Sequence, residues 1–203
     1  MSSGHETAAT GEHTARPPRR RRDPEKTREA IIDGLLAALT DGDFAPTTRT
    51  IAARAGTSER SIFVHFADRE ALLVAAVERQ SATVEACLVT PDPTLPLAER
   101  ITLAVRQSSA VFDLQRSPRL PGLQESRSVA EIDARMRRTD DRIRDTLAAL
   151  FAPELAGDDE LLDLVEGALA WPAHHHLRDR RGRSREQAAA AIERALRRLL
   201  AQG

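Results

Sequence analysis

Apolar residues recur three and four positions apart along most of this 203-residue chain, the spacing that places them on one face of an α-helix. The first such stripe contains Ile31, Ile32, Leu35, Leu36 and Leu39. No segment alternates β-branched with polar residues, and no hairpin turn such as Asn-Gly separates candidate strands. The sequence therefore predicts an all-α fold of about nine helices.

The first 22 residues differ in composition from the rest of the chain. They are rich in Ser, Thr, Gly and Pro, end in the run RPPRRRR, and show no apolar periodicity with which to build a core. We expect residues 1–22 to form a disordered, arginine-rich arm. Asp23 and Pro24 then have the pattern of a helix start, because proline at the first helical position lacks only an N–H that would have no partner there.

The overall composition is that of a soluble globular protein, with 41% hydrophobic residues. No run approaches the roughly 18 uninterrupted apolar residues of a membrane helix, and the N-terminus lacks the apolar segment of a signal peptide. We therefore expect a cytoplasmic protein. The single cysteine, Cys87, excludes an intrachain disulfide, and we expect it to be a packing residue rather than a redox sensor. The net charge of -1 gives no overall attraction to nucleic acid.

The segment TIAARAGTSERSIFVHF, residues 50–66, has the pattern of two short helices joined by a tight turn. Ala52 and Ala55 are small enough for the two helices to cross closely. Gly56 can adopt a positive φ in the turn at no steric cost. Three apolar residues are expected to point inward onto the first helical stripe: Ile51, Ile62 and Phe66.

The second helix of this pair leaves polar side chains free to enter a DNA groove. A major groove about 12 Å wide admits one helix, and hydroxyls and arginine read base edges through hydrogen bonds. The helix that Asp68 would cap adds a phosphate contact through Arg69. We therefore predict a three-helix, helix-turn-helix DNA-binding domain over residues 23–67. Outside the arm, the predicted DNA-binding residues are Thr47, Thr48, Arg49, Ser58, Glu59, Arg60, Ser61, Phe63, His65 and Arg69.

The affinity of this domain for DNA cannot come from its net charge. Segment 25–80 carries seven basic and nine acidic side chains, whereas five of the seven residues from Arg16 to Arg22 are arginine. We hypothesise that the arm lies along phosphates or in an adjacent minor groove. The alternative is an unbound, solvated tail. The arm residues assigned to DNA are Arg19, Arg20, Arg21 and Arg22.

The stretch GDFAPTTRTIAARAGTSERSIFVHFADREALLVAAV, residues 42–77, resembles the DNA-binding domain of the tetracycline-repressor (TetR) family of bacterial transcription regulators. The shared order of features is a glycine turn, paired threonines, Ile-Ala, Ala-Gly, Ser, an aromatic residue, His-Phe, an acidic-basic-Glu step and Leu-Leu. Two positions depart from the family pattern. Phe63 stands where tyrosine is usual, which removes a phenolic hydroxyl, and Arg69 stands where lysine is usual, which keeps the charge.

The resemblance implies a ligand-responsive repressor that binds a near-palindromic operator as a homodimer. Residues 68–203 would then form a helical domain that binds a small-molecule effector and dimerises. The last two helices of each chain would form a four-helix interface from Leu161, Val165, Ala168, Leu169, Ala188, Ile192, Ala195, Leu196 and Leu199. The effector pocket would be lined by Val105, Phe112, Met136, Phe151 and Trp171, with ordinary core packing as the alternative for each of them.

The three consecutive histidines do not indicate a metal site. On a helix, His174, His175 and His176 would point about 100° apart, whereas zinc-binding pairs are usually four positions apart. No second cluster of Cys or His accompanies them. We expect them to form a polar helix end beyond Pro172.

No catalytic constellation is expected either. The carboxylate pairs Asp140-Asp141 and Asp158-Asp159 indicate solvated or helix-starting residues, and the sequence contains no nucleophile motif or phosphate loop. We therefore expect neither enzyme activity nor a cofactor. Two alternatives to the repressor remain: a helical enzyme, which would need convergent catalytic groups, and an architectural or recombinase-type helix-turn-helix protein without an effector.

Overall fold

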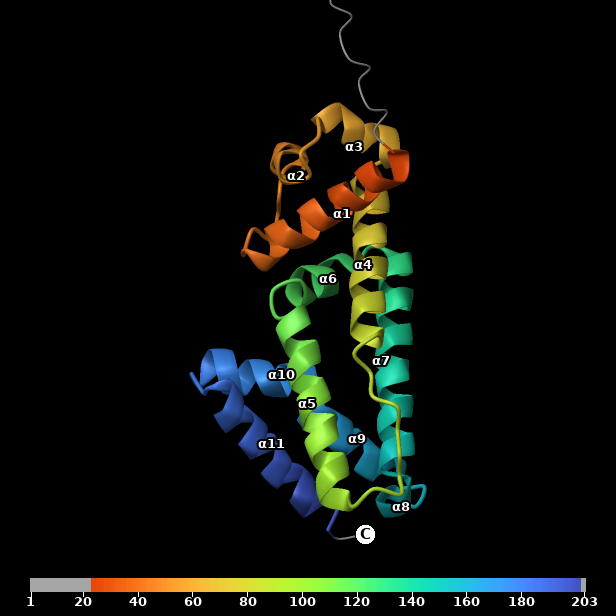
Figure 1. The fold of residues 1–203 in the computed structure, drawn as a ribbon, viewed down its shortest axis with the longest axis vertical. Helices are drawn as coiled ribbons and strands as arrows, with labels where there is room; N and C mark the ends of the chain where they lie inside the picture. Colours follow the sequence, from red (N-terminus) through yellow and green to blue (C-terminus); the bar gives the residue numbers. More distant parts are fainter. Residues whose placement is uncertain (1–22, 202–203) are drawn as a thin grey trace, which may run out of the picture.

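The computed structural model describes residues 23–201, and every regular element within them is a helix, which confirms the all-α prediction. The elements are α1 (Pro24–Thr40), α2 (Thr48–Arg54), α3 (Glu59–His65), α4 (Arg69–Glu85), α5 (Leu97–Gln115), α6 (Arg119–Glu125), α7 (Ala130–Leu150), α8 (Ala152–Leu155), α9 (Asp159–Leu169), α10 (Trp171–His175), the π-helical segment η1 (His176–Arg180) and α11 (Arg185–Leu199). Figure 1 shows an elongated molecule with α1–α3 at one end and α8, α9 and α11 toward the other.

Side-chain caps fix where the first four helices begin. Asp23, Thr47 and Ser58 accept hydrogen bonds from backbone N–H groups in the first turns of α1, α2 and α3. Asp68 accepts one from the first turn of α4 at 2.8 Å. These caps satisfy N–H groups that have no partner within the helix. Gly56 has a φ of +60° in the turn between α2 and α3, as the turn pattern predicted.

The apolar core of the three-helix unit continues into the rest of the chain. Ile51, Ile62 and Phe66 are buried, as predicted, and they share one cluster with Leu73 of α4 and Ile132 of α7. Burial of such side chains is the main source of stability for short helices. The helix-turn-helix unit is therefore supported directly by α4 and α7.

α4 and α7 lie side by side and are joined by charged hydrogen bonds (Figure 1). Arg135 of α7 is only 7% exposed. Its Nε donates to Glu78 Oε2 at 2.6 Å and its Nη1 to Glu85 Oε1 at 2.7 Å, both on α4. The Arg135 guanidinium also holds the pKa of Glu85 below its ordinary value. These bonds fix the position of α4 against α7.

A second core cluster lies among α5, α7, α9 and α11. Arg100, which is 4% exposed, supports it from the start of α5 by donating to both carboxylate oxygens of Glu154 at 2.5 Å.

Over residues 23–201, no helix is both long enough and apolar enough to cross a membrane.

Candidate DNA-binding face and ligand cavities

The outward face of α3 carries the side chains that are free to meet a ligand. Arg60 is exposed, and Phe63 and Val64 are 61% and 73% exposed, while Ile62 on the opposite face is 3% exposed. Ser61 is half-buried. Large apolar side chains exposed on a short, capped helix are typical of a binding face rather than of ordinary surface. Of the predicted α3 residues, Arg60 and Phe63 are thus exposed, together with Val64, which was not predicted.

Several predicted DNA-binding residues are also bonded to one another. Thr48 Oγ1 donates to Glu59 Oε2 at 2.6 Å, and Arg49 Nε lies 3.7 Å from Glu59 Oε1. The hydroxyl oxygens of Ser58 and Ser61 are 3.0 Å apart. Glu59 thus joins the start of α3 to the start of α2, a positioning role that the sequence did not reveal.

Arg69 has a protein partner as well as an exposed position. Its Nη1 lies 3.0 Å from Glu125 Oε1 on α6, and its side chain is 55% exposed. The predicted phosphate contact and the observed ion pair require the same guanidinium. The arm residues Arg19–Arg22, assigned to DNA from the sequence, lie outside the described residues.

A cavity of about 280 Å³ lies among α5, α7, α9 and α10, below the three-helix unit. Phe112 and Trp171, predicted as pocket residues, both line it and lie 6.0 Å apart between ring centroids. Ile143 and Leu147 of α7 add apolar surface, and Glu166 of α9 adds a carboxylate. We call this space the effector-domain cavity.

The other three predicted pocket residues do not line the effector-domain cavity. Phe151 is 0% exposed and belongs to the second core cluster, so core packing is the correct interpretation for it. Val105 is 1% exposed and borders a shallow surface hollow beside α11. Met136 lines a different cavity, described next.

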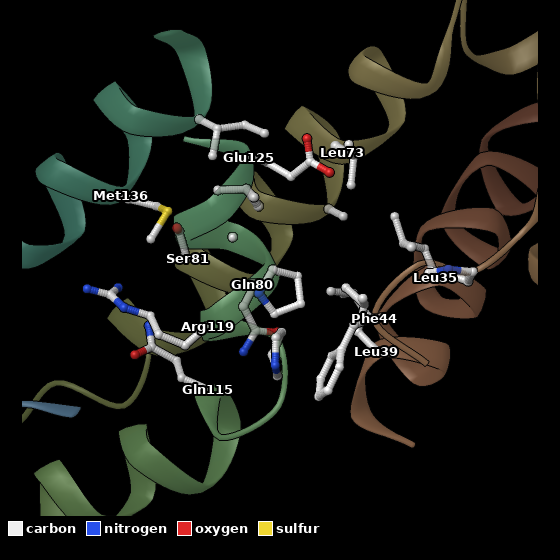
Figure 2. Close-up of a pocket in the computed structure, with 18 of the residues that line it drawn as sticks. Leu35, Leu39, Phe44, Leu73, Gln80, Ser81, Gln115, Arg119, Glu125 and Met136 are labelled. Atoms are coloured by element: carbon white, nitrogen blue, oxygen red, sulfur yellow. The ribbon is translucent and has the colours of Figure 1, made fainter. Parts of the chain in front are cut away.

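The second cavity lies where the three-helix unit meets the remainder of the chain, and we call it the junction cavity. Figure 2 shows Leu35, Leu39 and Phe44 on one side of it and Ser81 and Met136 on the other. The sequence did not predict it, because its walls come from five separated segments. The remaining wall residues are Leu36, Pro46, Arg69, Leu73, Ala76, Val77, Gln80, Gln115, Pro118, Arg119, Pro121, Gly122, Glu125, Ile132 and Thr139.

The expectation that the three histidines form a polar helix end is wrong for His174. The backbone turns at Ala170, between α9 and α10, and α10 packs against α5. His174 is consequently 1% exposed, lies 3.0 Å from Ser108 Oγ through Nε2, and stacks on Phe112 at 5.3 Å. Burial, with a contribution from Arg178, lowers its pKa to about 4, so the ring is neutral at pH 7.

The free energy of unfolding should therefore decrease as the pH falls from 7 to 4. Unfolded His174 titrates near its ordinary pKa of 6.5 and the folded form near 4, so the unfolded state binds the extra proton between these values. We expect His174 to account for a loss on the order of 2 kcal/mol in unfolding free energy from pH 7 to pH 4. Urea unfolding at pH 7, 5.5 and 4 should show a smaller loss for His174→Gln than for the unaltered chain. Identical losses in the two proteins would contradict this assignment.

The nine residues predicted for the dimer interface divide into two groups by their burial. Five of the nine residues are already enclosed within their own chain and cannot offer an outer surface: Val165, Leu169, Ala188, Ile192 and Leu196. They are core residues because α9 and α11 pack on each other and on α5. Four are half-buried: Leu161, Ala168, Ala195 and Leu199. Leu164, which was not predicted, is 58% exposed on α9.

One member of each carboxylate pair has a structural partner. Asp158 caps α9 by accepting from Leu161 N at 2.9 Å, as a helix-starting residue should. Asp140 accepts from Arg119 of α6 at 3.1 Å. Over residues 23–201, no group of three or more His, Cys, Asp or Glu side chains is arranged to hold a metal ion.

Comparisons with known proteins point to one family. Residues 31–76, from α1 into α4, match the family model described as bacterial regulatory proteins, tetR family. A transcriptional regulator from Rhodococcus sp. Rha1 shares the fold with a TM-score of 0.70 at 17% identity, over 89% of this chain and 97% of that one. A TetR family transcription regulator from Marinobacter aquaeolei VT8 has a TM-score of 0.61 at 24% identity, over 90% and 97%.

A third solved structure, the Flavonoid-responsive Regulator FrrA, has a TM-score of 0.60 at 18% identity, over 88% of this chain and 97% of that one. No curated protein sequence matches the chain. At these identities the solved structures establish the fold, and the family model matches the segment from α1 into α4 that contains the helix-turn-helix. Residues 31–76 are thus similar to the TetR family model, and the chain shares its fold along nearly its whole length with solved transcriptional regulators.

Proposed function

We propose that this protein is a ligand-responsive repressor of the TetR family that binds a near-palindromic operator as a homodimer. Residues 23–67 would bind DNA, and residues 68–203 would bind the effector and the second subunit. The observation that carries the proposal is the outward face of α3, where Arg60, Phe63 and Val64 are exposed on a helix held by the core beneath it. Arginine can bond bidentately to guanine, and apolar side chains can contact thymine methyl groups.

The direct test is binding to the DNA upstream of the protein's own gene. Fluorescence anisotropy should show saturable binding that unrelated DNA of equal length does not compete away. The stoichiometry should be two chains for each site, because a two-fold symmetric protein matches a near-palindromic sequence. One chain per site, or equal affinity for unrelated DNA, would contradict the proposal.

The homodimer would use the surface left exposed on α9 and α11. Leu164, with 58% of its surface exposed, is the most exposed leucine on these two helices, and Leu161 and Ala168 of α9 are half-buried. Exposed apolar side chains of this kind favour self-association. Leu164→Glu should therefore shift the protein toward the monomer in sedimentation, whereas Leu123→Glu, at another exposed leucine, should not.

The effector would bind in the effector-domain cavity. Its aromatic and aliphatic lining suits a small organic molecule, and pockets of this kind bury most of their ligand's surface. FrrA, which shares the fold, is described as flavonoid-responsive, which supports a small-molecule effector here. Binding would release DNA only if the ligand prefers the conformation that binds DNA poorly. Trp171, the only tryptophan, lines the cavity and should report binding through its fluorescence.

Glu125 should compete with DNA for Arg69. If Arg69 must leave Glu125 to reach a phosphate, then Glu125→Gln should strengthen operator binding about threefold, as expected for loss of an exposed ion pair in each subunit. Glu131→Gln removes the same charge from an exposed site on α7 and serves as the control. The gain should disappear in an Arg69→Gln background. A gain that persists there would show that Glu125 acts only through general charge.

The arm should contribute through its charge. We expect deletion of residues 1–22 to weaken operator binding and to flatten the dependence of affinity on salt, because fewer counterions are released from DNA. The measurement is the slope of log affinity against log salt for the two chain lengths. Equal slopes would show that the arm is an unbound tail.

A further inference from the structure

The junction cavity has few charges free to attract an ion. Two guanidinium groups border it, and each faces a carboxylate. Arg69 lies 3.0 Å from Glu125, and Arg119 lies 3.1 Å from Asp140. A charged ligand would have to break one of these pairs or remain unpaired in a largely apolar space, and both are costly. The cavity therefore favours an uncharged molecule.

Two polar side chains in the cavity wall can form hydrogen bonds with a ligand. Ser81 of α4 is 6% exposed and Gln115 of α5 is 8% exposed, and both line the cavity. A serine hydroxyl can donate and accept a hydrogen bond, and a glutamine amide donates through its nitrogen and accepts through its oxygen. A ligand group that donates or accepts a hydrogen bond could therefore bond to either side chain.

Most of the remaining wall residues are apolar, and they limit the size of the occupant. Leu35 and Leu39 of α1, Leu73 of α4 and Met136 of α7 surround the space, and the Phe44 ring lies at one side (Figure 2). The cavity volume is about 60 Å³. A single water needs roughly 10–15 Å³ on this measure, so the cavity has room for a few water-sized groups, about one small ring.

We propose that the junction cavity is a binding site for a small, uncharged ring compound with one hydrogen-bonding group, such as a hydroxyl, directed at Ser81 or Gln115. This site is separate from the effector-domain cavity, although Gln115 and Arg119 border both. Its walls include α1 of the DNA-binding unit and α4, which connects that unit to the remainder of the chain. The proposal concerns binding and does not rest on the proposed operator or effector.

The test uses the full chain without DNA and three compounds of similar size: p-cresol, toluene and benzoate. p-Cresol offers an apolar ring and a hydroxyl, toluene lacks the hydroxyl, and benzoate carries a charge. Isothermal titration should show saturable binding of p-cresol, binding of toluene about fivefold weaker, and little binding of benzoate. The fivefold difference is what one neutral hydrogen bond typically contributes.

Three variants test whether the compounds bind in the junction cavity. Ser81→Ala should weaken p-cresol binding about fivefold and leave toluene unchanged. Gly122→Leu should block both compounds, because a Cβ there faces Met136 Sδ at 3.6 Å and a longer side chain would fill the cavity. Ile143→Trp, which narrows the effector-domain cavity instead, should leave p-cresol binding intact. Ser81→Ala keeps the test valid if Gly122→Leu does not fold, as judged by circular dichroism.

Three results would overturn the proposal. One is the absence of saturable p-cresol binding. Another is loss of binding in Ile143→Trp with retention in Gly122→Leu, which would place the compound in the effector-domain cavity. The third is benzoate binding as tightly as p-cresol. Failure of operator binding would overturn the proposed function and leave this result unaffected, because no DNA is present.

Discussion

Replacing Arg60 and Ser61 together by alanine is expected to weaken binding to the gene's own upstream DNA about a hundredfold. Arg60 is exposed on the outward face of α3, and Ser61 is half-buried beside it. A good base contact is worth about 1–3 kcal/mol of discrimination, and a homodimer would lose each contact twice. Because Ile62 and Phe66 hold α3 from the opposite side, the change should leave the fold intact.

The control for this double change is Arg138→Ala. Arg138 is exposed on α7, away from α3, so its loss removes the same charge without touching the proposed face. Anisotropy measured at several salt concentrations separates general charge from base contact, because loss of a phosphate contact changes the salt slope whereas loss of base readout lowers specificity. Undiminished, sequence-specific binding by a folded, dimeric Arg60→Ala/Ser61→Ala protein would contradict the role assigned to α3.

Local signals in the sequence were sufficient to predict the helix-turn-helix unit. The caps at Asp23, Thr47 and Ser58 each depend on a side chain and a backbone N–H only two or three residues away. The positive φ of Gly56 is likewise a local property of the turn. The inward positions followed from helical spacing on a stripe beginning at Ile31. Each of these features could be predicted because its partner lies nearby in the chain.

Features that depend on distant partners were not predicted. Helical spacing showed that α9 and α11 have apolar faces, but it could not show whether residues such as Val165 and Leu196 face their own chain or a second one. The pair between Arg69 and Glu125 joins residues 56 positions apart. The burial of His174 follows from the turn at Ala170, whose direction is set by packing against α5.

The cavities show the same dependence on tertiary structure. Phe112 and Trp171 line a cavity, whereas Phe151, of similar chemical character, is core. Composition cannot separate these two outcomes, because an aromatic side chain is suited to both. The junction cavity escaped prediction because Phe44 and Met136 meet there only after α1 and α7 have packed on α4. Helical spacing alone therefore does not identify which apolar residues line a cavity.

Replacing Gly34 by valine is expected to destabilise the DNA-binding unit by about 3 kcal/mol and to weaken operator binding. Gly34 lies in the buried face of α1, and a Cβ there would approach Ile51 O at 3.0 Å and Ala55 N at 3.2 Å. Both contacts are to the backbone of the α2 region, which cannot move aside as a flexible side chain could. Overpacking of this kind typically costs about 1–3 kcal/mol, and two further methyl groups place Gly34→Val at the upper end of that range.

The matched control is Ala37→Val in the same helix, where the side chain is exposed. It adds the same branched side chain to α1 without entering the contact with α2, so its effect should stay within about 0.5 kcal/mol. Urea unfolding gives the free energies, and anisotropy gives operator affinity under conditions where each protein is folded. Equal stability of the two variants would mean that α1 and α2 do not approach as closely as the structure has them. The support of α3 would then need another explanation, because α3 packs against both α1 and α2.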